Sequence, residues 1–439
     1  MTKDDLFSSL LRWNLWGREK LDASPRVILE EIESFLDYKG AVVIQGPRRA
    51  GKSTLLYMII DKLAERYSEK QCLYINFEDY ALKATNMTPI LIQDMIEVYA
   101  EKVYDSSDFF LFLDEIQNVS EWHRWVRTYV DTTRKTVFVS GSSSKLMSSE
   151  IAGLLTGRHV SFEVMPFSFR ELYRIHGHSD DAVYVERNRI KIKKLLEQYT
   201  RTGGFPEVAL RWQEDESGAM RILSQYAEDI VLKDIAVHFN IMNMRILRFI
   251  AHYLAQNSGS KVSIRKLQRM IEGEYSEKSS TTTIANYLEY LVEAYLAIEL
   301  KHFDYSIKRT FRKPSKYYIC DPGLRNAMAS SLTPDYGKLL ENVVFLYLRS
   351  VYDELYFWSD TREVDFVGIR NRIADLYNVT YVSNLKEIDE RELQAFADFP
   401  SETRVRNRYL ITWDLEERIT YKGVKIDALP AWKLLIKKP

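Results

Sequence analysis

Residues 41–54 have the sequence AVVIQGPRRAGKST, and residues 55–60 continue it as LLYMII. The run begins with apolar, largely β-branched residues, which are typical of a short buried strand, and it ends in residues typical of a buried helix. Between them lies a complete G-x-x-x-x-G-K-[ST] spacing, whose glycines let backbone amides turn toward phosphate oxygens at the positive end of a helix dipole. The stretch therefore predicts a P-loop within an α/β nucleotide-binding core.

Individual side chains of this loop have expected roles. Lys52 is predicted to reach the β- and γ-phosphates, and Ser53 is predicted to offer its hydroxyl to Mg²⁺. ATP and Mg²⁺ are therefore the expected ligands. The residues expected to bind the nucleotide are Gly46, Pro47, Arg48, Arg49, Ala50, Gly51, Lys52, Ser53 and Thr54.

An acidic partner for the metal follows another apolar run. Residues 109–113, FFLFL, are typical of a buried central strand and lead directly into Asp114 and Glu115. Asp114 is predicted to hold Mg²⁺, and Glu115 to polarise the attacking water as a general base. With the apolar run at residues 72–77, parallel strands alternating with helices predict a three-layer α/β core.

Two further positions are candidates for contact with the phosphates. After the strand predicted at residues 136–140, Ser142 or Ser143 would sense the γ-phosphate, although a plain serine-rich turn has the same sequence. Arg158 would stabilise transition-state charge, either within one subunit or across the interface of a homo-oligomer. A surface ion pair is the alternative for Arg158.

Together these motifs resemble the archaeal-type AAA family of P-loop ATPases. Besides the P-loop, the resemblance rests on short motifs spread over nearly the whole chain: NFED at 76–79, LDEIQNV at 113–119 with Trp122, GSSSKL at 141–146, LLTGR at 154–158, PFSFRE at 166–171, GGFPE at 203–207 and DIVLKD at 229–234. The resemblance implies an ATPase with a helical lid and a C-terminal domain of unknown function.

The amino-acid composition limits the partners and the cellular location that we expect for the chain. The 439 residues carry a formal net charge of −1, so the whole chain gives no electrostatic case for nucleic acid or membrane. No apolar run is long enough to span a bilayer, the first residues include acids where a secretory signal is basic, and the two cysteines lack metal-ligand or redox spacing. We therefore expect a cytoplasmic protein that does not enter a membrane.

The length of the chain predicts several domains. We expect an AAA-type P-loop ATPase core over residues 1–165 and a helical lid over residues 166–240. A winged helix-turn-helix is expected over residues 241–325, and a domain similar to restriction endonucleases over residues 326–439.

The winged helix is predicted from helical patterns at residues 244–256, 263–271 and 279–295, followed by two extended segments. The third helix, whose first turn is rich in hydroxyl groups, would face the major groove of double-stranded DNA. The wing would add six positive charges against Asp304, from Lys301, Lys308, Arg309, Arg312, Lys313 and Lys316. A winged helix that only connects domains is the alternative.

The C-terminal segment resembles the PD-(D/E)xK fold of restriction endonucleases, because Glu341 in a predicted helix is followed by Asp365 and then by another strand. In an active nuclease that strand carries an acid, one intervening residue and a lysine, whereas Asn378 and Thr380 hold those positions here. A neutral amide is a weak Mg²⁺ ligand, and threonine supplies no ammonium group, so we expect the fold without cleavage. The alternatives are a shifted register through Asp375, a cation from Lys386, and purely structural roles for Glu341 and Asp365.

These features predict an ATPase whose nucleotide state moves the lid and the winged helix, with double-stranded DNA as the partner. Lys52, Ser53, Asp114 and Glu115 would carry the chemistry. One alternative is a slow nucleotide-dependent switch or scaffold that holds another protein. The other is an ATP-dependent nuclease.

Overall fold

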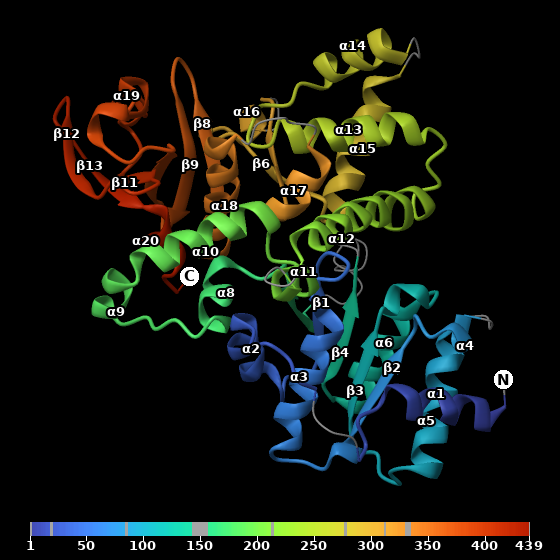
Figure 1. Ribbon diagram of the computed structural model, residues 1–439. Coiled ribbons are helices and arrows are strands. Elements are labelled where there is room, and N and C mark those ends of the chain that lie inside the picture. Colours follow the sequence, from blue (N-terminus) through green and yellow to red (C-terminus); the bar gives the residue numbers. More distant parts are fainter. Residues whose placement is uncertain are drawn as a thin grey trace. The chain divides into compact units, whose positions relative to one another are not determined.

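The structure is a computed structural model that describes residues 2–17, 21–83, 87–142, 157–211, 215–275, 279–310, 313–329 and 335–438. The chain divides into two compact units, Met1–Met165 and Pro166–Pro439 (Figure 1). Within the described residues no helix is long and apolar enough to cross a membrane.

The first unit is built on a sheet of five parallel strands in the order β2-β3-β4-β1-β5. Four of the strands are almost entirely buried, because helices cover both faces of the sheet. β4 lies between β1 and β3, so the end of β4 separates the P-loop from the acids that follow β3. The strands are β1 (Ala41–Gln45), β2 (Cys72–Asn76), β3 (Phe110–Asp114), β4 (Val137–Gly141) and β5 (His159–Glu163).

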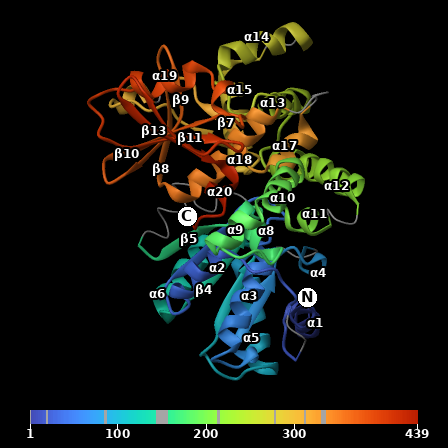
Figure 2. The same cartoon turned by 60° about the vertical axis from the view of Figure 1, so that its left-hand side comes forward.

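Two hydrophobic cores, one on each face of this sheet, complete three layers (Figure 2). α1 (Lys3–Trp13), α5 (Pro89–Lys102) and α6 (Trp122–Thr133) contribute to one core. α2 (Val27–Ile32) and α3 (Lys52–Ala64) contribute to the other, and the short α4 (Tyr80–Lys83) follows β2. The predicted three-layer α/β core with a parallel sheet is therefore confirmed.

The N-terminal segment covers the edge of the sheet at β2. The side chain of Asn14 accepts a hydrogen bond from the N–H of Tyr74 and donates one to its carbonyl, both at 2.8 Å. The indole N–H of Trp16 donates to the carbonyl of Cys72 at 2.9 Å. These side chains take the place of a neighbouring strand, because they satisfy backbone groups that an edge would leave open.

The second unit begins with helices over the segment expected to form a lid. Gly203 has a φ of +70°, and a Cβ there would lie 2.0 Å from an Asp321 carboxylate oxygen. Asp321 accepts hydrogen bonds from the N–H groups of Gly204 and Leu324 at 2.6 and 2.9 Å, so this break between helices is joined to the start of α17 (Pro322–Met328). The helices are α8 (Phe169–Ile175), α9 (Ala182–Arg187), α10 (Arg189–Thr202), α11 (Pro206–Arg211) and α12 (Glu216–Asp229), continued by a π-helix (Ile230–Val237).

The helices and the strand pair expected for a winged helix are present in sequence order. The helices are α13 (Met244–Gln256), α14 (Ile264–Tyr275) and α15 (Thr281–Glu293), and α14 contacts α15. β6 (Ala297–Leu300) and β7 (Lys316–Ile319) form an antiparallel pair. The short α16 (Ile307–Thr310) lies between these strands in the sequence, and α17 (Pro322–Met328) follows them.

One part of the predicted wing charge is wrong. The side chain of Lys316 is 2% exposed and contacts carboxylates within the second unit, so it does not face solvent. Arg309 and Lys313 each lie 3.7 Å from Asp304, which offsets part of their charge. Arg312 and the side chain of Lys308 lie outside the described residues.

The C-terminal part of the second unit holds a six-stranded sheet in the order β12-β13-β11-β10-β9-β8 (Figure 1). β8, β9 and β10 are antiparallel neighbours, whereas β11 is parallel to β10 and to β13. The elements are α18 (Tyr336–Val351), β8 (Glu354–Ser359), β9 (Glu363–Arg370), β10 (Ile373–Val379), α19 (Glu390–Asp398), β11 (Val405–Thr412), β12 (Glu417–Tyr421), β13 (Val424–Pro430) and α20 (Ala431–Leu435).

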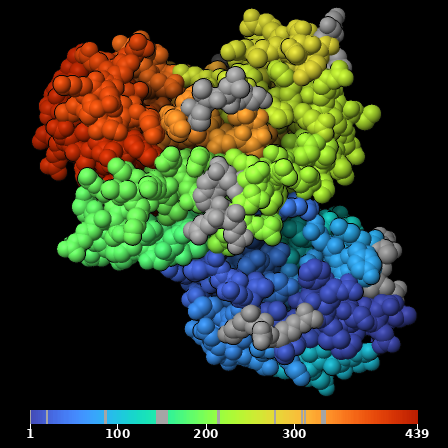
Figure 3. Space-filling model, in the orientation of Figure 1, coloured from blue at the N-terminus to red at the C-terminus, as the bar shows by residue number. Residues whose placement is uncertain are grey.

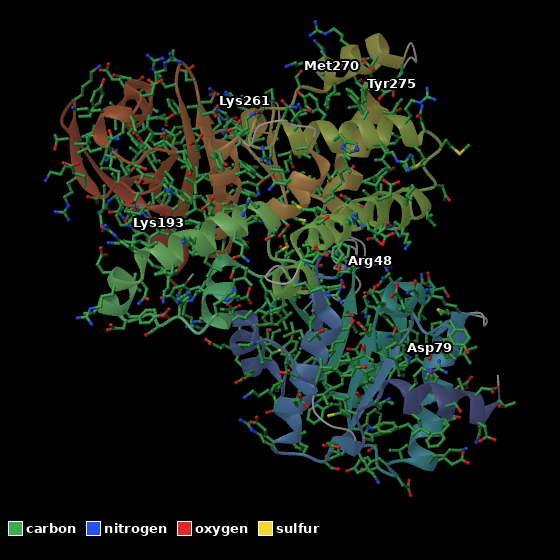
Figure 4. The ribbon with its side chains drawn as sticks, in the orientation of Figure 1. Arg48, Asp79, Lys193, Lys261, Met270 and Tyr275 are labelled. Carbon is green, nitrogen blue, oxygen red and sulfur yellow. The ribbon has the colours of Figure 1, made fainter. Side chains whose placement is uncertain are left out.

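α10 is attached to this C-terminal part by an ion pair. The Lys193 ammonium lies 2.7 Å from a carboxylate oxygen of Asp414, and Figure 4 shows Lys193 on this helix. The lid-like helices and the C-terminal sheet therefore belong to one compact unit.

Candidate nucleotide-binding site

The P-loop follows β1 and enters α3 through two glycines with positive φ. Gly46 has a φ of +150°, and a Cβ there would lie 2.0 Å from the carbonyl oxygen of Val164. Gly51 has a φ of +96° and caps the start of α3. Only glycine adopts such conformations without strain, so both positions need the residue that the motif places there.

Lys52 begins α3, and its side chain turns back over the loop. Its ammonium donates to the carbonyl oxygens of Gly46 and Pro47 at 3.1 and 3.0 Å, and it lies 3.8 Å from a Glu115 carboxylate oxygen. The side chain is only 3% exposed. The ammonium therefore stands inside the loop, where phosphate oxygens would compete with neutral carbonyls for its N–H donors.

Asp114 ends β3 with its carboxylate fully buried. One oxygen accepts from the Tyr74 hydroxyl at 2.5 Å, and the other accepts from the hydroxyl of Ser140 on β4. Burial, together with the neighbouring Asp114 charge, raises the pKa of Tyr74 well above its usual value, so this phenol remains a donor. Two hydroxyls thus fix the orientation of the carboxylate.

Glu115 has a φ of +54° and is held on several sides. Its N–H donates to the Ser140 hydroxyl at 3.2 Å, and one carboxylate oxygen accepts from the Gln117 amide at 2.5 Å. The same Gln117 amide lies 3.4 Å from the Ser142 hydroxyl. Contacts therefore run from Lys52 through Glu115 and Gln117 to Ser142.

The structure thus brings together Lys52, Asp114, Glu115 and Ser142. Ser53 and Thr54 lie in the first turn of α3. Ser143 lies outside the described residues. The β4 residue that touches both acids is Ser140, which the sequence did not single out.

Arg158 is not part of this group, which corrects the expectation of an arginine near the phosphates in the same subunit. It pairs with Asp131 of α6, and its carbonyl accepts from the N–H of Ala41 at 2.8 Å, at the start of β1. The P-loop follows the opposite end of β1. In a parallel sheet these ends are separated by the full strand, about 3.3 Å per residue.

Two arginines, one before the loop and one within it, form contacts that the sequence did not predict. Arg26 donates to the carbonyl oxygens of Ala50 and Met165 at 2.8 and 2.6 Å, and so bridges the P-loop to the last residue of the first unit. Arg48, labelled in Figure 4, donates to Glu78 at 2.8 Å. Arg26 precedes the P-loop by many residues and belongs to no motif, so the sequence carried no signal for it.

The residues present fit a magnesium ion. Mg²⁺ prefers oxygen ligands and takes most of them from water and phosphates, with one or two from protein. The hydroxyl of Ser53 and the carboxylate of Asp114 are such groups. Within the described residues the carboxylate of Asp114 accepts only from hydroxyls and pairs with no cation, so its buried negative charge is available to a metal.

Relatives of the chain share nearly its full length. A protein of Methanocaldococcus jannaschii, described as uncharacterized, is 32% identical over 442 residues, which cover 98% of this chain and 95% of that protein. The chain belongs to the same family as this archaeal protein. A further member from Haemophilus influenzae, also described as uncharacterized, is 31% identical over 412 residues, which cover 92% of this chain and 97% of that protein.

Two domain families match successive parts of the chain. The AAA domain matches residues 38–173, which include the P-loop and the Asp114–Glu115 pair. A domain of unknown function (DUF8612) matches residues 193–335. The resemblance to AAA-type P-loop ATPases is therefore confirmed for the first unit, and in this chain the AAA domain is followed by a domain of unknown function.

Solved structures align with lower similarity. The Walker-type ATPase of Pyrococcus abyssi aligns with a TM-score of 0.47 and 14% identity over 70% of this chain and 96% of that chain. The ORC1 protein of Aeropyrum pernix, solved in complex with DNA, aligns with a TM-score of 0.33 and 12% identity over 72% of this chain and 95% of that chain.

Proposed function

We propose that this protein hydrolyses ATP with magnesium and couples its nucleotide state to a winged-helix module that acts on double-stranded DNA. The observation that carries the proposal is the convergence of Lys52, Asp114 and Glu115 beside the P-loop. A loop that only bound phosphate would need no buried carboxylate oriented by two hydroxyls and no second acid next to it.

Each residue has a defined task in this proposal. Bound Mg²⁺ would neutralise charge on the β- and γ-phosphates. Lys52 would exchange its contacts with the Gly46 and Pro47 carbonyls for phosphate oxygens, and Asp114 would hold the metal together with Ser53. Glu115 would orient the attacking water and accept its proton. Gln117 and Ser142 would keep Glu115 in place beside the phosphate.

Arg26 supports coupling between the nucleotide and the second unit. It bonds both to Ala50 in the P-loop and to Met165, where the first unit ends in the chain. A change in loop conformation on phosphate binding would therefore act on the junction at Met165–Pro166. Arg26→Ala is expected to keep ATP binding and to lose any effect of DNA on hydrolysis.

Exposed side chains of the second unit support DNA as the partner. Thr281, Thr282 and Asn286 are exposed on α15, and hydroxyl and amide groups of this kind contact base edges in the major groove. The neighbouring α14, yellow in Figure 3, exposes cations suited to phosphates. These cations are Arg265, Lys266 and Arg269.

The deciding experiment measures steady-state ATP hydrolysis with Mg²⁺, alone and with double-stranded DNA, with Lys52→Ala as the blank. We expect turnover above the blank, stimulation by DNA, and loss of the stimulation when Arg265, Lys266 and Arg269 are changed to alanine. A control variant removes three exposed cations of the first unit instead, Arg66, Lys70 and Arg124. No turnover above the blank would refute hydrolysis and leave nucleotide binding.

A slow switch that holds a protein partner is the second candidate. It is favoured by the wing, where Lys316 is buried and Asp304 lies beside Arg309 and Lys313, which leaves fewer charges for DNA. Turnover that DNA does not change, with each ATP hydrolysed slowly, would support this candidate over action on DNA.

A further inference from the structure

Glu341 and Asp365, the acids expected at a nuclease metal site, surround a lysine from the strand pair together with Glu363, which was not expected there. Lys316 of β7 places its ammonium 2.7 Å from Glu363, 3.4 Å from Glu341 and 3.4 Å from Asp365. These acids come from the start of β9 and from α18, so side chains of two other elements converge on the nitrogen of a β7 residue.

The acid and amide groups around the Lys316 ammonium already form hydrogen bonds within the protein. Asp365 accepts from the N–H of Val379 at 3.0 Å, and Glu341 accepts from the Tyr318 hydroxyl at 2.6 Å. The Asn378 amide accepts from the N–H of Asp365 at 3.1 Å and donates to a Glu392 carboxylate oxygen at 2.8 Å. Neither end of the Asn378 amide is therefore left for a metal.

The two other residues considered for a nuclease site, Asp375 and Lys386, have different surroundings. Asp375 accepts from Asn407 and Tyr352 at 2.9 and 2.8 Å and pairs with Arg406, so the shifted register through Asp375 is wrong. Lys386 is exposed, and the structure brings Lys316 to the acids instead. No group of three or more acidic, histidine or cysteine side chains among the described residues is arranged to hold a metal ion.

We infer that the Lys316 ammonium is a built-in cation that takes the place of a metal among Glu341, Glu363 and Asp365, so that this domain joins the β6–β7 pair to the C-terminal sheet and does not cleave DNA. Partly buried carboxylates are stabilised by a nearby positive charge, and a lysine from the same chain supplies it permanently. A divalent ion at the same point would meet a fixed ammonium and be repelled.

A further contact strengthens the inference. Lys261, labelled in Figure 4, lies 2.8 Å from the other carboxylate oxygen of Glu363, so a second lysine reaches the same acids. Burial opposes the charged form of Lys316, but Tyr318, Glu341, Asp365 and Glu363 together raise its pKa well above the usual value.

The test asks whether removal of this ammonium creates a metal site. Lys316→Met keeps the apolar stem and removes the charge, and Lys313→Met is the matched control on an exposed lysine nearby. Binding of Mn²⁺ to the full chain without nucleotide is measured by the loss of the free Mn²⁺ resonance signal. Melting temperature is measured with and without Mn²⁺.

We expect Lys316→Met to bind one more Mn²⁺ per chain than the wild type and to regain several degrees of lost melting temperature when Mn²⁺ is added. Wild type and Lys313→Met should show neither effect, and a further Asp365→Asn change should abolish both in the Lys316→Met chain. A folded Lys316→Met chain without extra Mn²⁺ binding would overturn the inference.

The wild-type chain provides a measurement that does not depend on folding of the variant. We expect no nicking of supercoiled plasmid by the wild type in Mn²⁺ or Mg²⁺, and no Mn²⁺ binding that is sensitive to Asp365→Asn. Metal-dependent nicking that disappears in Asp365→Asn would overturn the inference and establish a nuclease.

Discussion

Each unit of the protein contains a buried lysine near at least one carboxylate, yet the two lysines bond to different kinds of group. Lys52 donates to two neutral backbone carbonyls and lies 3.8 Å from Glu115, whereas Lys316 lies within 3.4 Å of three carboxylates. A neutral carbonyl gives up a lysine to a phosphate readily, but carboxylates hold a buried lysine, because separating them leaves uncompensated charges. The comparison shows that the partners of a lysine, more than its burial, distinguish a ligand site from a structural one.

The largest expected effect concerns Glu115 in the first unit. Glu115→Gln retains shape and hydrogen bonding but removes the base, so kcat for ATP should fall on the order of 10²–10⁴-fold. The affinity for ATP, measured with a fluorescent nucleotide, should change little. Unchanged kcat would mean that Glu115 is not the base. The acids near Lys52 would then no longer differ from those near Lys316 by a catalytic role.

Exchanging each lysine for methionine sharpens the comparison directly. Lys316→Met should lower the free energy of unfolding by about 3 kcal/mol, the lower end of the range for a buried pair, since it leaves three partly buried carboxylates without their cation. Lys52→Met should cost only about 1 kcal/mol, because it removes hydrogen bonds to neutral carbonyls. Urea denaturation measures both, and equal losses would contradict the distinction. Hydrolysis should show the reverse order and fail only in Lys52→Met.

Glu392, whose carboxylate accepts a hydrogen bond from Asn378, should also make the stability of the chain depend on pH. Burial raises the pKa of Glu392 to about 7, although its hydrogen bond with Asn378 opposes this shift. An acid whose folded pKa is raised keeps its proton longer in the folded chain, so its contribution to stability declines as pH rises from about 4.5 to about 7.

Glu392→Gln should remove this decline while it keeps an acceptor for Asn378. The free energy of unfolding of wild type minus that of the variant should therefore fall by roughly 1–3 kcal/mol between pH 4.5 and pH 7. A difference that stays constant over this range would show that Glu392 titrates normally.

The smallest effect is expected at Arg158. Its ion pair with Asp131 is partly exposed to solvent, so Arg158→Ala should change the free energy of unfolding by at most about 1 kcal/mol. Hydrolysis by dilute protein should be unchanged. A strong loss of hydrolysis that appears only at concentrations where subunits associate would instead assign Arg158 to the site of a neighbouring subunit.

The sequence alone predicted the parts of the site that are local in the chain. The P-loop, the strand before it and the acids after β3 follow from apolar runs with polar residues at their ends. The contacts of Ser140 and Gln117 could not be predicted, because they depend on β4 lying between β1 and β3. Arg158 did carry a usable signal, since it precedes a strand whereas phosphate-binding residues follow one.

The cluster of Lys316 and its three acids was harder to predict, because these residues are distant in the chain. Lys316 belongs to one strand pair, and its acids lie on α18 and β9. In the sequence Lys316 stands among other cations, and such a group of charges is typical of a solvent-facing wing. Only the packing of β7 against these elements shows that it is buried.

The cover that Asn14 and Trp16 place over β2 has a consequence for handling the protein. The backbone groups of Tyr74 and Cys72 that they occupy are the ones through which an exposed edge recruits a strand from another molecule. A chain shortened past Trp16 would present this edge to its neighbours. Its failure would then be aggregation through β2, with the P-loop itself still intact.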